Sequence, residues 1–217
     1  KDGTDPVDDT FDKVAMLKNI GNEVVQPNYS GWLTAMNQLD SDATLFDSNP
    51  TAAQLQIVQS SFIDAYKKWE SCSVFEIGPA ADNSMRTRVN TFPSDTAQIE
   101  LNVASGDYDL DVAKNADANG FASLDYLLFH ESESLLSDPN RMTYLLDNVQ
   151  RILIQSVEVS DKWASYQSEF EVSTTSSAGG SISNLVNEIN FEFELFKNAR
   201  IGIPLGKKTL GVTQAHK

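Results

Sequence analysis

Apolar residues recur at steps of three and four along most of this chain, which is the spacing of one face of an α-helix. Three such stripes follow one another in the first third of the sequence, over residues 11–24, 29–46 and 55–69. Each stripe is long enough for several helical turns. The pattern therefore predicts a series of long amphipathic helices.

The breaks between these stripes carry residues that interrupt helices. Pro27 lacks a backbone donor and crowds the preceding turn, so it predicts a kink or a break. Residues 47–50, Asp-Ser-Asn-Pro, predict a turn. Thr51 followed by Gln54 is a capping-box pattern, so the third helix is expected to begin there and to end by Gly78-Pro79.

The periodicity weakens over residues 80–119. A short helix is predicted to begin near Ser94 and to close at Ser105-Gly106-Asp107. The stretch after Gly120 is densely apolar through Phe129 and predicts a compact buried helix.

The last third of the chain again predicts long helices. Asp138-Pro139 opens the first of them, with proline at the position where its missing donor costs nothing. Residues 173–183 are rich in Ser, Thr and Gly and predict a flexible link. A final apolar stripe follows, with Lys197 and Arg200 in its last turn, where cations suit the helix dipole, before Gly202 and Pro204 stop it.

No segment with a period of two stands out, so the chain is predicted to be all-α, an antiparallel helix bundle. We divide it into a polar leader (1–9), a first four-helix-type bundle (10–137) and the start of a second, truncated bundle (138–217). We infer the second bundle from a weak sequence similarity between residues 17–26 and 146–155. The alternative explanation is a chance similarity of two amphipathic helices. The polar start is expected to follow a removed leader or to come from cloning.

Composition narrows the classes of function. There are 31 acidic and 16 basic side chains, a net charge of −15, which disfavours nucleic acids and anionic membrane surfaces because both carry negative charge. No apolar run approaches the roughly 18–20 residues of a spanning helix. The single cysteine, Cys72, excludes a disulfide framework within the chain and is expected to be a buried core residue rather than a reactive thiol.

Two acidic patterns could be taken for metal sites. Asp107-x-Asp109-x-Asp111 resembles the start of a calcium loop, but later positions that need Gly and Glu are Val112 and Ala118, so a solvated acidic loop is expected. His130-x-x-Glu133 could present two ligands on one helix face. It follows an apolar run, however, and a histidine at a helix end is favoured by the dipole without any metal.

Two carboxylates in apolar surroundings are of greater interest. Asp125 lies within the apolar stretch after Gly120, and Glu76 lies beside Gly78-Pro79. A buried carboxylate is costly unless it is paired or hydrogen-bonded. Each is expected either to accept bonds from helix termini, Arg86 or Arg88, or to contact a ligand in a cleft, and we favour the first. No serine triad, phosphate loop, dinucleotide fingerprint or His-Glu-x-x-His motif is present.

Several segments together resemble the imelysin-like family, which is classed with the metallopeptidases. The resembling segments, in chain order, are 26–29 (Gln-Pro-Asn-Tyr), 69–79 (Trp-Glu through Phe-Glu-Ile-Gly-Pro), 88–93 (Arg-Val-Asn-Thr-Phe-Pro), 120–129 (Gly-Phe-Ala-Ser-Leu-Asp-Tyr-Leu-Leu-Phe) and 197–206 (Lys through Ile-Gly-Ile-Pro-Leu-Gly). Each is weak alone, but their order covers most of the chain. The resemblance implies two four-helix bundles around a central cleft, in extracytoplasmic bacterial proteins that are often lipid-anchored and linked to iron or haem uptake.

The chain departs from the family at its signature, Gly-x-His-x-x-Glu. Gly120 is retained, but the histidine position is Ala122 and the glutamate position is Asp125. Alanine cannot bind a metal, and aspartate is one methylene shorter than glutamate. If the motif binds a metal or helps hydrolysis, this chain has lost that role, and no cofactor is predicted.

The leading hypothesis is an extracytoplasmic, periplasmic or cell-surface binding protein without peptidase activity. A lipid anchor upstream of Lys1 is compatible with it. Its ligand, a small molecule, a metal or a protein, is expected near five residues, which are Glu76, Pro79, Gly120, Phe121 and Asp125. The alternatives are a metallopeptidase that uses Asp125 with groups outside this chain, and an acidic module that binds another protein.

Overall fold

The computed structural model describes residues 11–175 and 177–208, and this part of the chain is helical without a strand. Its α-helices are α1 (Lys13–Ile20), α2 (Gln26–Ser48), α3 (Ala52–Cys72), α4 (Pro79–Asp82), α5 (Met85–Val89), α6 (Thr96–Ser105), α7 (Gly120–Asp125), α8 (Pro139–Val172) and α9 (Ser181–Leu195). The π-helical segments are η1 (Gly21–Val25), η4 (Tyr126–His130) and η6 (Phe196–Gly202). The 3₁₀ turns are η2 (Ser73–Phe75), η3 (Ala113–Asn115) and η5 (Ser134–Leu136). The predicted leader and the last nine residues lie outside the described residues.

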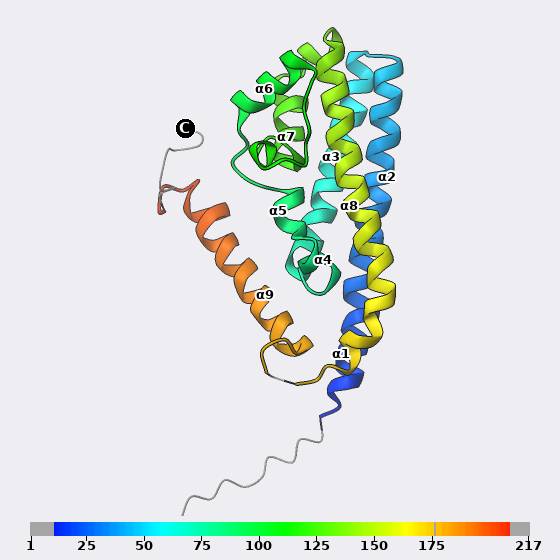
Figure 1. Cartoon of the computed structure of the whole chain (residues 1–217), viewed down its shortest axis with the longest axis vertical. Helices are drawn as coiled ribbons and strands as arrows, with labels where there is room; N and C mark the ends of the chain where they lie inside the picture. The colour runs from blue at the N-terminus through cyan, green and yellow to red at the C-terminus, as the bar shows by residue number, and fades with distance from the viewer. Residues whose placement is uncertain (1–10, 176, 209–217) are drawn as a thin grey trace, which may run out of the picture.

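Three long helices form the body of the molecule. Figure 1 shows α2 running antiparallel to both α3 and α8, and α2 packs extensively against each of them. The predicted all-α antiparallel bundle is therefore confirmed. The place of a fourth long helix is taken by the short helices α4 to α7, which lie along one side of α3 and α8.

Large aromatic side chains fill the space between the long helices. Trp32 on α2 packs against Trp69 on α3 with ring centroids 5.1 Å apart, and Tyr29 meets Trp163 of α8 edge-on at 5.8 Å. All four side chains are at most 1% exposed. Burying a large apolar side chain stabilises a fold by about 1.5–3 kcal/mol, so these contacts hold the bundle together.

The helix boundaries follow the predicted caps. The Thr51 side chain accepts the Gln54 N–H at the start of α3, and the Asp138 side chain accepts the Asn140 and Arg141 N–H groups at the start of α8. Each bond satisfies a donor that the first helical turn leaves without a partner.

Pro27 distorts the first long helix without breaking it. The helix widens into the π-helical segment η1 just before Pro27 and continues as α2. Such a bulge re-satisfies backbone groups where the regular pattern is interrupted.

Residues on both sides of the predicted boundary at 137/138 contribute to one hydrophobic core. Met142, Leu145 and Ile152 of α8 belong to the same buried cluster as Leu39 and Val58 of the preceding helices. The start of a second bundle beyond this boundary stays a prediction. Helix α9 stands at the outer edge of the molecule (Figure 1), where it packs against η2 at the end of α3.

Candidate functional site

The segments that resemble the imelysin-like family lie far apart in sequence but make contact in space. The Tyr29 hydroxyl of the first segment donates to the Phe75 carbonyl of the second. Arg200 of the last segment forms an ion pair with Glu70 of the second. The fold thus brings together parts of the chain that sequence reasoning could only place in order.

Gly120, the first motif residue, is fixed between two other elements. Its φ of +81° is in the left-handed region, and a Cβ there would lie 2.4 Å from the Val89 carbonyl oxygen. Its N–H donates to Asn148 Oδ1 of α8 at 3.1 Å. Glycine is required here because any larger residue would both strain the backbone and collide with α5.

A buried network of amides holds the loop that leads into Gly120. Asn102 Nδ2 donates to Asn115 Oδ1 at 3.0 Å and to the Tyr144 hydroxyl at 3.1 Å. Asn119 Nδ2 donates to the Leu110 carbonyl at 3.1 Å. Since these polar side chains are almost fully buried and each is bonded, the loop is rigidly attached to α6 and α8.

The other two motif positions lie one turn apart on α7. Ala122 is partly buried, and Asp125 is exposed. The expectation that Asp125 sits in an apolar setting was wrong, because its apolar sequence neighbours Leu124, Leu127 and Leu128 occupy the opposite, buried side.

These positions do not fit a resident metal ion. Ala122 has no donor atom, and a methyl group cannot replace an imidazole ligand. Among residues 11–175 and 177–208, no three His, Cys, Asp or Glu side chains are grouped so as to hold a metal. Protein metal sites rest on several such ligands, so no chemistry through a metal follows from these residues.

Glu76 has the structural role that we favoured from the sequence. Its Oε2 lies 2.6 Å from Arg86 Nη1, and its Oε1 accepts the Arg86 backbone N–H at 2.9 Å. Burial raises the pKa of Glu76, and Glu188 and Glu192 raise it further, while the two contacts with Arg86 lower it. The carboxylate is therefore committed to fixing the start of α5.

Arg86 also ties α9 to the rest of the molecule. Its Nη2 lies 2.8 Å from Glu188 Oε2 and 2.7 Å from the Ser73 carbonyl, and its guanidinium stacks over the Phe191 ring at 4.7 Å. Glu192 lies between Arg86 and Arg200. Its Oε2 lies 3.4 Å from Arg86 Nε, and its Oε1 lies 3.1 Å from Arg200 Nη2. We call these charged residues, together with Glu76 and Glu70, the α9 clamp.

A cavity of about 530 Å³ lies between α5 and the C-terminal segment. It is lined by Tyr66, Arg86, Thr87, Asn90, Thr91, Phe92, Phe191, Leu195, Ala199, Arg200, Ile203 and Pro204. Two of the family-like segments, 88–93 and 197–206, face each other across it. Its walls are mainly apolar, and both arginines are neutralised by the α9 clamp, so the cavity suits an apolar ligand better than a free anion.

None of the five predicted ligand residues lines this cavity, although two of them contact residues that do. Glu76 pairs with Arg86, and the buried Phe121 ring packs against Tyr66 at 5.2 Å. Pro79 is buried at the start of α4. Phe191 and Leu195, which do line the cavity, were visible in the sequence as members of an apolar helix without any sign of what they face.

The other polar patterns have structural roles. The His130 side chain is 74% exposed at the end of η4, 3.0 Å from Glu131 and stacked on Tyr126. In the acidic loop, Asp109 Oδ1 accepts the Asp111 N–H at 2.9 Å. Cys72 is fully buried, as predicted, and burial raises the pKa of its thiol to about 12.

Comparison with known proteins gives three kinds of match. The family model described as Imelysin, of the peptidase class M75, matches residues 25–217. Iron-regulated protein A of Synechococcus elongatus is 25% identical over 136 residues, which is 62% of this chain and 37% of that protein.

Two solved structures share the fold. A chain from Parabacteroides distasonis, described as an iron-regulated protein A precursor, superposes with a TM-score of 0.76 at 18% identity, covering 94% of this chain and 64% of its own. An imelysin-like protein from Psychrobacter arcticum gives a TM-score of 0.73 at 16% identity, covering 89% of this chain and 63% of its own. The chain thus spans less than two thirds of the length of each of these relatives.

Within the part of the chain that is described, no helix is long and apolar enough to cross a membrane.

Proposed function

This chain belongs to the imelysin family, and we propose that within it the chain is an extracytoplasmic binding protein that acts in iron or haem uptake and has no peptidase activity. The observation that carries the proposal is Ala122 at the histidine position of the motif, on a scaffold that otherwise keeps Gly120 in its required conformation. A peptidase that depends on a metal needs that metal to polarise the carbonyl or activate water. A chain that lacks the ligand but keeps the fold is suited to binding rather than to hydrolysis.

The cavity between α5 and the C-terminal segment is the proposed ligand site. Its aromatic and aliphatic walls include Phe92, Phe191 and Ile203, and it is within the range of 300–1,000 Å³ that is typical of small-molecule sites. The link to iron or haem is supported by the relative named iron-regulated protein A. The location outside the cytoplasm, as a periplasmic protein or lipoprotein, is carried over from the family resemblance.

Peptide cleavage tests the loss of hydrolysis. The protein is incubated with a mixture of unstructured peptides and with Zn²⁺, Mn²⁺, Co²⁺ or Fe²⁺ in turn, and products are followed by mass spectrometry. The wild type is expected to give no metal-dependent cleavage. Cleavage that Asp125→Ala abolishes would instead establish a metallopeptidase that works with a carboxylate at the second motif position.

Binding of haem tests the cavity. Haem is titrated into the protein and followed by its absorbance. Phe191→Ala, which removes a ring from the cavity wall, is expected to weaken binding about tenfold. Val186→Ala, on the same helix and outside the cavity lining, is the matched control and should bind as the wild type does. Absence of binding at micromolar haem, or equal effects of both variants, would remove haem from the proposal.

A further inference from the structure

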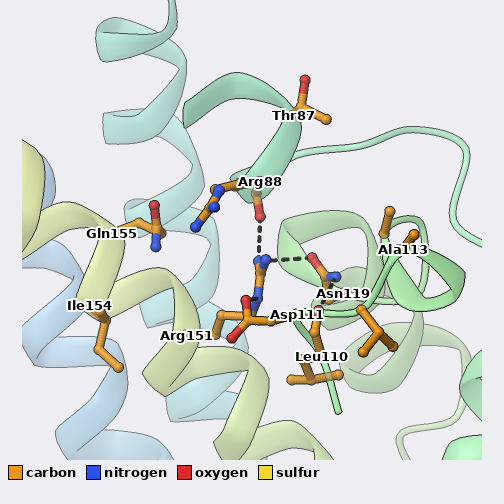
Figure 2. Close-up of a pocket in the computed structure, with 11 residues that line it drawn as sticks. Thr87, Arg88, Leu110, Asp111, Ala113, Asn119, Arg151, Ile154 and Gln155 are labelled. Carbon is orange, nitrogen blue, oxygen red and sulfur yellow. Dashed lines mark hydrogen bonds and ion pairs between the residues drawn. The ribbon is translucent and has the colours of Figure 1, made fainter. Parts of the chain in front are cut away.

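A second cavity, of about 460 Å³, lies on the other side of α5 from the first. It is enclosed by α5, by the loop of residues 110–119 and by α8 (Figure 2). Thr87 lines both cavities, so α5 forms the wall between them. The charged and amide side chains in its lining are those of Arg88, Asp111, Asn119, Arg151 and Gln155.

One guanidinium is held in a fixed position at the floor of this cavity. Arg151 Nη1 donates to the Arg88 carbonyl at 2.6 Å and to Asn119 Oδ1 at 3.0 Å, and its Nε lies 3.2 Å from Asp111 Oδ1. Figure 2 shows these bonds converging on Arg151. None of them uses Nη2. The side chain is thus pre-organised, with two N–H donors on Nη2 left over from this set of bonds.

The oxygen of a buried amide one turn further along α8 has no hydrogen-bond partner in the described part of the chain. Gln155 is 6% exposed and lines the cavity four residues after Arg151. Its Oε1 atom is buried and has no hydrogen-bond partner among the described residues. An unsatisfied buried acceptor costs about 1–3 kcal/mol, so such a group calls for a donor that residues 11–175 and 177–208 do not supply.

A second guanidinium lies over the same part of α8. The side chain of Arg88 extends towards Gln155 in Figure 2 and is exposed. The pKa of Glu158 is lowered, mainly by the hydrogen bond from Lys162. The charge of Arg88 lowers it further by a smaller amount. The lining thus holds two guanidinium groups and one carboxylate, that of Asp111, and carries a net positive charge on a chain whose net charge is −15.

We propose that this cavity binds a small hydroxycarboxylate. The carboxylate would bind Arg88 and Nη2 of Arg151, because planar guanidinium groups match the two oxygens of a carboxylate. A turn of the Gln155 amide would bring its buried Oε1 to the cavity, where a hydroxyl group of the same ligand would donate to it. The apolar residues Leu110 and Ile154 leave room for a short carbon chain. This site does not depend on the function proposed for the first cavity.

Calorimetric titration in metal-depleted buffer tests the proposal with three probes, citrate, tricarballylate and inorganic phosphate. Citrate carries a hydroxyl, tricarballylate is its analogue without one, and phosphate is an anion without a carbon chain. Citrate is expected to bind with one-to-one stoichiometry and about five- to tenfold more tightly than tricarballylate. Absence of citrate binding at 10 mM, roughly the weakest useful affinity, or phosphate binding as tight as that of citrate, would overturn the proposal.

Three variants separate specific binding from charge and folding effects. Arg88→Gln should weaken citrate binding about tenfold, since the exposed side chain contributes a charge-assisted bond. Lys114→Gln removes the same charge from the neighbouring loop outside the cavity lining and should change nothing. Gln155→Met should abolish the preference for citrate over tricarballylate. Equal effects of Arg88→Gln and Lys114→Gln, or an unchanged preference in Gln155→Met, would show that citrate binds elsewhere or without the proposed contacts.

Discussion

At the scale of single residues, backbone conformation and burial decide which positions of the motif can change. Gly120 is held by a positive φ, by the nearby Val89 carbonyl and by Asn148. Ala122 meets no such constraint, because it is partly exposed on α7. The chain therefore retains the motif glycine for its architecture, whereas the ligand position is open to substitution without loss of the fold.

Gly120→Ala should be strongly destabilising. For a residue with a Cβ, this backbone conformation costs about 1–3 kcal/mol, and the clash with Val89 adds to that cost. We therefore expect the free energy of unfolding to fall by about 3 kcal/mol or more. Gly179→Ala is the matched control, since Gly179 has a φ of +92° but no described atom within 4 Å of the added Cβ. It should cost about 1 kcal/mol. Equal losses in urea unfolding would mean that the Val89 contact is unimportant.

Cys72 should be inert in the folded protein. Its burial and its pKa of about 12 keep the thiol protonated and out of reach of reagents at neutral pH. Labelling with iodoacetamide at pH 7.5 is expected only after denaturation. Rapid labelling of the native protein would contradict the packing of Cys72 between the long helices.

At the scale of elements, ion pairs join segments that the sequence separates widely. Glu100 on α6 receives bonds from Arg141 of α8 and from the Tyr126 hydroxyl of η4, at 2.7 and 2.9 Å. The hydrogen bond from Arg141 is the main reason that the pKa of Glu100 is lowered, and the Tyr126 bond lowers it further, against the opposing effect of burial. Three elements around the motif helix are therefore linked through one carboxylate.

Glu100→Gln should remove a pH-dependent part of the stability. Because the folded pKa of Glu100 lies below its ordinary value of 4.5, its stabilisation is present above that pH and is lost as pH falls through the folded pKa. Since Glu100 is partly exposed, we expect about 1 kcal/mol between wild type and variant at pH 7, shrinking below pH 4.5. Glu158→Gln, which breaks an exposed pair with Lys162 on one helix, should cost about 0.3–0.5 kcal/mol. Urea unfolding from pH 3 to 7 measures both, and a difference for Glu100→Gln that does not vary with pH would contradict the assignment.

Helix α9 has two apolar faces with different surroundings. Leu185 is 6% exposed and belongs to the core cluster, whereas Val186 next to it is 60% exposed. Leu185→Ala should lower the free energy of unfolding by about 2–3 kcal/mol, and Val186→Ala should change it by less than about 0.5 kcal/mol. The reverse order in urea unfolding would mean that α9 is attached through its other face.

At the scale of the whole molecule, the long helices and their ends could be predicted from the sequence because they depend on local signals. Stripes of apolar residues predict α2, α3 and α8, and the capping residues Thr51 and Asp138 predict where α3 and α8 begin. The π-helical segment before Pro27 was anticipated only as a kink, since the sequence does not say how the backbone bonds are re-formed.

The candidate sites were less predictable because they are made by contacts across the chain. Arg86 meets Glu188, which is 102 residues away, and no local pattern encodes that pairing. Asp125 looked buried because its sequence neighbours are apolar, but the helical period places it on the solvent side. The apolar pattern thus predicts the motif helix α7 correctly, but it does not show that the carboxylate of Asp125 is exposed to solvent.

We propose that the side chain at position 122 decides whether the motif can bind a metal. Calorimetric titration with Zn²⁺ tests it on the wild type, Ala122→His and the double variant Ala122→His, Asp125→Ala. We expect no stoichiometric binding by the wild type, a new site in Ala122→His because the imidazole and Asp125 would lie one turn apart, and its loss in the double variant. One equivalent of Zn²⁺ bound by the wild type and lost in Asp125→Ala would mean instead that the motif binds a metal without a histidine at position 122.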